Sequence, residues 1–158
     1  MAISGISSGW IQPTFSEDKL DMDITTAAAQ YEEATHFFLN LVNGLSEEAL
    51  DISDGEGWTP RQVIHHVADA EVQFGVRYAN ALAEDNPAII PFDEEKFPDA
   101  LQYHKRSVEA SLNAMTSMHA MNYEILKNAS EADWKRISTH PQRGAVTLFD
   151  LVSMGTNH

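Results

Sequence analysis

Histidine is the residue type that offers this sequence its clearest chemistry. The chain has seven histidines and no cysteine, so a bound metal would need histidine, aspartate or glutamate ligands. His65 and His66 are adjacent, and His158 lies far along the chain. A neutral imidazole suits zinc, nickel, copper or iron. Whether these histidines can meet depends on the helices that carry them.

A long helix is predicted to begin at Pro60 and to end at the Asn86-Pro87 step. The side chain of Thr59 can accept hydrogen bonds from the first free amides, and Gln62 completes a capping box. Proline suits the first helical position, where no backbone donor is lost, whereas the residue before a proline avoids the helical conformation.

His65, His66 and Glu71 are predicted to lie on different sides of this helix. At about 100° per residue, His66 falls on one flank of the apolar face and Glu71 on the other, while His65 points away toward solvent. Periodicity alone favours His66 as a packed residue at the edge of the core, satisfied by a hydrogen bond. A metal ligand is the alternative interpretation.

A shorter, similarly capped helix is predicted to begin at Thr147. Its apolar face extends to Gly155, and His158 lies on the flank of that face. Gly155 is alternatively a C-terminal cap. Inward-facing histidines on separate helices are a common way to build a metal site in a bundle, although catalytic zinc usually has three protein ligands.

The remaining sequence predicts an all-α protein. Residues 23–42 and 100–127 carry apolar side chains at helical spacing, and residues 85–98 form a proline-containing connection. No segment shows sustained strand alternation. Residues 1–20 are predicted to be an irregular N-terminal arm, and residues 21–158 one helical bundle domain. The other histidines are interpreted as packed, surface or turn residues: His36, His104, His119 and His140.

The strong negative charge argues against some partners. Ten lysines and arginines stand against 24 aspartates and glutamates, which gives a formal net charge of −14. A chain this acidic repels phosphate backbones and anionic membrane surfaces, so neither nucleic acid nor a membrane is expected as a partner. No apolar run is long enough for a membrane span and the N-terminus lacks the pattern of a secretory signal, so a cytoplasmic location is expected.

Residues 57–71 resemble the second-helix signature of the DinB/YfiT-like superfamily, and residues 83–87 and the His140-Pro141 turn add to the similarity. The resemblance implies an up-down-down-up four-helix bundle, often a homodimer, that holds a divalent metal with three histidines. Two of these ligands fall on His66 and His158. The third would lie four residues after His158, so the last helix is expected to be cut short and the chain to continue.

The same resemblance implies an enzyme that acts on a small-molecule substrate through a divalent metal, zinc or nickel. The reaction would be hydrolysis, or the transfer of a low-molecular-weight thiol cofactor to an electrophile. No general base is assigned, and Glu71 is the candidate for supporting the site without binding the metal. A non-catalytic helical bundle or dimerisation module with an incomplete or vestigial metal site is the alternative.

Overall fold

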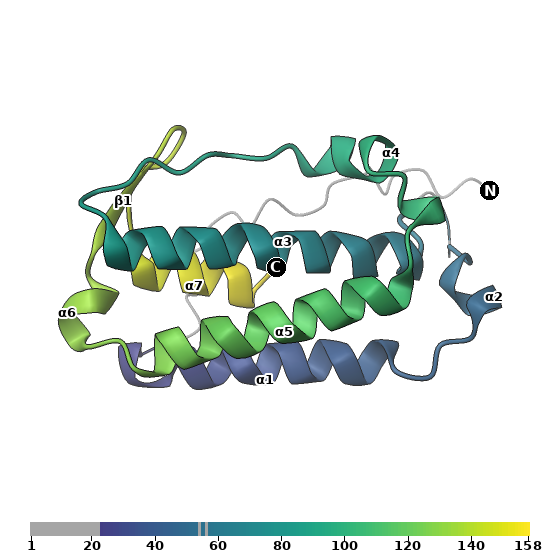
Figure 1. Ribbon diagram of the computed structural model, residues 1–158, viewed down its shortest axis with the longest axis horizontal. Helices are drawn as coiled ribbons and strands as arrows, with labels where there is room; N and C mark the ends of the chain where they lie inside the picture. Colours follow the sequence, from purple (N-terminus) through teal and green to yellow (C-terminus); the bar gives the residue numbers. More distant parts are fainter. Residues whose placement is uncertain (1–22, 54, 56) are drawn as a thin grey trace, which may run out of the picture.

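The computed structural model describes residues 23–53, 55 and 57–158, so the predicted N-terminal arm lies outside the described residues. Four helices form the bundle: α1 (Ile24–Val42), α3 (Pro60–Ala83), α5 (Val108–Lys127) and α7 (Leu148–Thr156). Figure 1 shows α1 and α7 running in one direction and α3 and α5 in the other. The predicted all-α, up-down-down-up four-helix bundle is therefore confirmed.

Smaller elements connect the bundle helices. The described chain also contains α2 (Glu47–Leu50), η1 (Glu94–Lys96), α4 (Phe97–Ala100), η2 (Tyr103–Lys105) and α6 (Glu131–Trp134). It includes an antiparallel hairpin, β1 (Ile137–His140) and β2 (Gly144–Thr147), in which Ile137 pairs with Thr147 and His140 with Gly144. The prediction of no strand was wrong here, because four-residue strands are too short to show a clear alternation.

The helix boundaries follow from their capping residues. The Thr59 side chain accepts from the amide of Gln62, whose side chain in turn accepts from the amide of Thr59, as predicted. The helix predicted from residue 100 instead begins at Val108. Gln102, with a φ of 51°, interrupts the helical backbone, and Ser107 starts α5 by accepting from a first-turn amide.

The hydrophobic core lies between α1, α3 and α7, with α5 packed against α3 and α1. Tyr78 of α3 is fully buried at its centre, and Leu148, Leu151 and Val152 of α7 are also fully buried. Burying such side chains stabilises the fold by roughly 1.5–3 kcal/mol each. Within the part of the chain that the structure describes, no helix is both long and apolar enough to cross a membrane.

A long connection, residues 84–107, links α3 to α5 and runs back along α3 (Figure 1). Such a return is required because the two helices are parallel. Near its start, Ile89 donates its amide to the Thr139 carbonyl oxygen of the hairpin, at 2.9 Å. Near its end, Arg106 forms an ion pair with Asp69 of α3. The connection, anchored at both ends, carries Glu94 over the bundle.

Candidate metal centre

Three side chains capable of binding a metal meet at one place, and each comes from a different part of the fold. His66 lies in the second turn of α3, Glu94 begins η1 in the long connection, and His158 follows α7. The Nε2 atoms of His66 and His158 are 2.7 Å apart, and a carboxylate oxygen of Glu94 is 3.8 Å from Nε2 of His66. One ligand atom from each residue lies within 4.8 Å of the others.

The electrostatic setting keeps both imidazoles neutral. Burial lowers the pKa of His66 to about 4, and the neighbouring His158 adds to the shift. Loss of hydration also lowers the pKa of His158, although the charge of Glu94 acts in the opposite direction. At neutral pH both rings are therefore uncharged, and in the tautomer with its proton on Nδ1 each ring can present an Nε2 lone pair to a metal.

The donor set fits a divalent transition metal. Two imidazoles and one carboxylate are a ligand set found in catalytic zinc sites, and they leave a coordination position open for water or substrate. The edge contact of Trp58, whose ring centroid is 4.9 Å from that of His66, helps to fix the His66 ring. Nδ1 of His66 is buried without a hydrogen-bond partner among the described residues, so packing rather than an acceptor orients this ring.

The structure brings His66 and His158 together, as the sequence predicted, while their assignment as metal ligands stays a prediction. Glu94 is the residue that sequence reasoning missed. It lies in an acidic stretch of the connection, where an exposed charge is the ordinary expectation. The signal that identifies it is spatial: the connection returns along α3 (Figure 1) and brings a carboxylate oxygen of Glu94 to 3.8 Å from Nε2 of His66.

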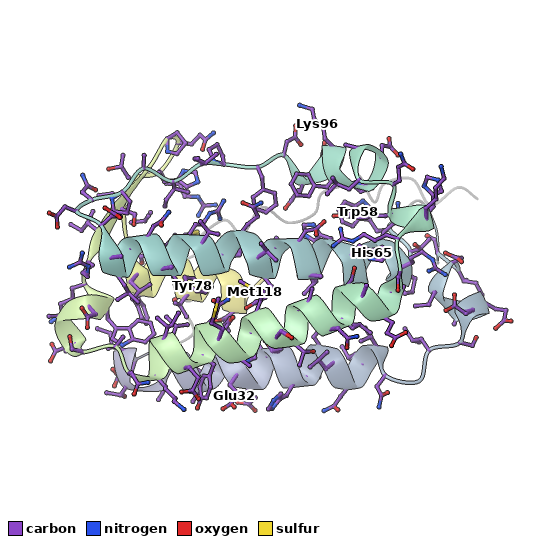
Figure 2. All side chains as sticks on the ribbon, in the orientation of Figure 1. Glu32, Trp58, His65, Tyr78, Lys96 and Met118 are labelled. Atoms are coloured by element: carbon purple, nitrogen blue, oxygen red, sulfur yellow. The ribbon has the colours of Figure 1, made fainter. Side chains whose placement is uncertain are left out.

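The prediction that His65 points to solvent was wrong. His65 is fully buried, its Nδ1 lies 2.8 Å from the Ser111 hydroxyl of α5, and its ring packs 5.2 Å from that of Tyr103. Figure 2 shows His65 and Trp58 at the end of the bundle where α3 begins. The prediction from helical periodicity assumed that only one face of α3 is buried. In the structure, α5 and the connection cover a second face, which carries His65.

Glu71 belongs to a separate buried cluster between α1, α3 and α5. Its carboxylate accepts from the Tyr31 hydroxyl and, at 2.8 Å, from the Asn122 side-chain amide. Gly75 makes room for Asn122, because a Cβ at this position would lie 2.8 Å from both polar atoms of that amide. The structure therefore gives Glu71 hydrogen-bond partners in the core, and none of them is His66, Glu94 or His158.

Replacing Glu71 by glutamine is expected to change how stability depends on pH. Burial raises the pKa of Glu71 above its ordinary value of 4.5, so the folded protein holds this proton more firmly than the unfolded chain. The free energy of unfolding should therefore fall as the pH rises from 4.5 to the folded pKa, and stay lower above it. Glu71→Gln should flatten this slope and raise the free energy of unfolding at pH 7 by about 1 kcal/mol.

Urea unfolding at pH 5 and pH 7 would measure this difference, with the exposed Glu33→Gln on α1 as the matched control. The glutamine oxygen can still accept from Tyr31 and Asn122, so the comparison isolates the buried charge. An unchanged slope in Glu71→Gln would show that another group sets the pH dependence.

Comparison with known proteins identifies the family of this chain. A family model described as the DinB superfamily matches residues 30–158. A protein of Oceanobacillus iheyensis named "putative metal-dependent hydrolase" is 33% identical over 120 residues, which cover 75% of this chain and 69% of the relative. A Bacillus cereus protein of the same name is 31% identical over 148 residues, covering 93% and 85%. The chain belongs to the DinB superfamily, which confirms the predicted family.

Two solved structures share the fold of this chain. YfiT from Bacillus subtilis, described as "a probable metal-dependent hydrolase with an unusual four-helix bundle topology", has a TM-score of 0.76 and 26% identity. The match covers 89% of this chain and 82% of that one. A mycothiol-dependent maleylpyruvate isomerase has a TM-score of 0.70 with 17% identity, over 87% of this chain and 57% of its own. At this identity the isomerase shows a shared fold alone.

Proposed function

We propose that this protein is a metal-dependent hydrolase of a small-molecule substrate, with His66, His158 and Glu94 as the ligands of a divalent cation, zinc or nickel. The observation that carries the proposal is the convergence of these three ligand atoms within 4.8 Å from three separate elements. The names of the relatives from Oceanobacillus iheyensis and Bacillus cereus support the same class of reaction.

His66 and Glu94 have distinct parts in this proposal. His66 is the inner ligand, with 12% of its side chain exposed, and Trp58 restrains its ring. Glu94, with 42% of its side chain exposed, lies nearer to solvent, so the carboxylate oxygen that does not bind the metal can accept a proton from a water molecule. When bound, a divalent cation in such a site polarises a carbonyl group and lowers the pKa of water.

The thiol-transfer reaction, the thiol cofactor, the homodimer and the cytoplasmic location remain predictions from the resemblance and the sequence. No residue among those described favours thiol transfer over hydrolysis. A screen that includes thiol conjugation alongside ester, lactone and amide hydrolysis would decide between the two reactions.

His66→Ala is expected to abolish stoichiometric metal binding, because it removes the least exposed ligand of the three. Elemental analysis of the purified full-length protein, followed by zinc and nickel titration after chelation, measures the effect. The exposed His36→Ala on α1 removes an imidazole elsewhere and should bind metal as the wild type does. Hydrolysis should disappear on chelation and return with added metal.

Two results would contradict the proposal. If His66→Ala retained the metal content of the wild type, these residues would not form the metal site. If the metal-loaded wild type hydrolysed none of the substrates but conjugated a thiol, the metal centre would stand and the reaction class would change.

A further inference from the structure

Arg77 lies on the same face of α3 as His66. The two residues are eleven positions apart, which is about three helical turns. The guanidinium carbon lies 4.9 Å from the ring centroid of Phe74 and 5.3 Å from that of Phe92 in the connection. One guanidinium nitrogen donates to the carbonyl oxygen of Ile90 at 3.3 Å. Two aromatic rings and one backbone carbonyl thus hold this side chain in place.

No carboxylate within the described part of the chain forms an ion pair with Arg77. This is unexpected in a protein with 24 acidic residues against ten lysines and arginines. By contrast, Arg61 pairs with Glu47 and Asp51, and Arg106 with Asp69. A guanidinium has five N–H donors, and the only hydrogen bond of Arg77 among the described residues is the one to the Ile90 carbonyl oxygen. The nitrogens of Arg77 without a partner are not fully buried, so they keep some access to solvent and to an incoming anion.

Partial burial without a counter-ion has an energetic cost. Desolvation lowers the pKa of Arg77, which means that its surroundings disfavour the charged form. A bound anion would offset this cost through charge-assisted hydrogen bonds, which are about twice as strong as neutral ones. The planar guanidinium, already restrained between two rings, loses little freedom when it binds such a group.

Arg77 lies close to the candidate metal centre. The Phe74 ring that contacts the guanidinium also lies 6.0 Å from the ring of His158. An elongated small molecule could therefore contact Arg77 at one end and the metal centre at the other.

We propose that Arg77 binds a carboxylate group of the substrate, while the bond to be hydrolysed lies at His66, Glu94 and His158. The substrate class is then an ester or amide that also bears a free carboxylate. This inference rests on the proposed hydrolase function. A carboxylate is favoured over a phosphate because the net charge of −14 repels a dianion more strongly than a monoanion.

A purely structural role would leave Arg77 holding Phe92 and Ile90 against α3. The two roles differ in how the enzyme ranks substrates. The test compares kcat/KM for para-acetoxybenzoate, which is anionic, with kcat/KM for phenyl acetate, which is neutral, using the zinc-loaded full-length protein. The wild type should prefer the anionic ester by about tenfold or more.

Arg77→Met keeps an apolar stem between the rings and should reduce this preference to near one. Arg77→Lys keeps the charge without the planar donor pair and should give an intermediate ratio. Lys135→Met removes a positive charge from the exposed position that follows α6 and should retain the wild-type ratio. A wild-type ratio near one, or an unchanged ratio in Arg77→Met, would overturn the role of Arg77 and leave the hydrolase proposal intact.

If neither ester is hydrolysed, no ratio of kcat/KM can be measured, and binding then decides the role of Arg77. Calorimetric titration with benzoate should then show binding to the wild type that weakens about tenfold in Arg77→Met and not in Lys135→Met. Equal benzoate affinity in Arg77→Met and the wild type, or no benzoate binding to either, would overturn the role of Arg77.

Discussion

Replacing Gly155 by alanine should destabilise the protein by about 3 kcal/mol, although alanine is normally the better residue inside a helix. Gly155 lies within α7, and a Cβ added there would overlap the hydroxyl of Tyr78. Tyr78 is fully buried, so its ring has no free space into which to move. Relief would therefore require α7 to shift away from α3. Urea unfolding of the variant and the wild type measures the difference.

A second substitution tests this cause directly. The Tyr78 hydroxyl has no hydrogen-bond partner among the residues described, so Tyr78→Phe alone should cost little. The double variant Gly155→Ala with Tyr78→Phe should recover most of the stability that Gly155→Ala loses, because the overlapping atom is gone. Additive effects of the two changes would mean that the Tyr78 hydroxyl is not what excludes a side chain at residue 155.

The same substitution should also weaken metal binding. His158 follows Gly155 by three residues, so a shift of α7 moves its ring away from His66. Zinc affinity should fall by about tenfold or more in Gly155→Ala and recover in the double variant. Gly155 was interpreted as an alternative helix cap from the sequence. In the structure it is the penultimate residue of α7, where the absence of a Cβ allows α7 to approach Tyr78 of α3 closely.

The elements that the sequence predicted well are those with local causes. Thr59, Pro60 and Gln62 define the start of α3 within four residues, and Thr147 with Asp150 defines the start of α7 in the same way. Apolar periodicity then places His66 at the edge of the apolar face of α3 and His158 at the edge of the apolar face of α7. That these two rings meet follows from the helix pattern together with the short hairpin before α7.

The features that could not be predicted depend on which elements become neighbours. His65 is buried because α5 runs beside α3, and periodicity within one helix carries no information on that neighbour. Glu94 reaches His66 because the connection is fixed at the hairpin and at Asp69, contacts that join residues far apart in sequence. Gln102 has a left-handed backbone, which prevents α5 from beginning at residue 100 as predicted. A glutamine gives no warning of this in the sequence, whereas a proline or glycine would.

Asp69→Ala should destabilise the protein by about 2–3 kcal/mol, because it removes the acceptor that holds the end of the connection against α3. Both Arg106 nitrogens donate to the Asp69 carboxylate, at 2.8 and 2.7 Å, and the Tyr103 hydroxyl donates at 2.7 Å. The Asp69 side chain is 14% exposed and that of Arg106 29%, so solvent only partly replaces the lost bonds. Thermal and urea unfolding measure the loss.

A paired substitution separates the buried charge from the loss of packing. Asp69→Ala leaves Arg106 partly buried and unpaired, whereas Asp69→Ala with Arg106→Met removes both charges and should regain part of the stability. Hydrogen exchange locates the effect: the Lys105 and Arg106 amides, which bond within the connection, should exchange faster in Asp69→Ala, while those of α1 change only with global stability. Equal acceleration throughout the protein would show that Asp69 stabilises the bundle as a whole, and that the position of Glu94 depends on other contacts.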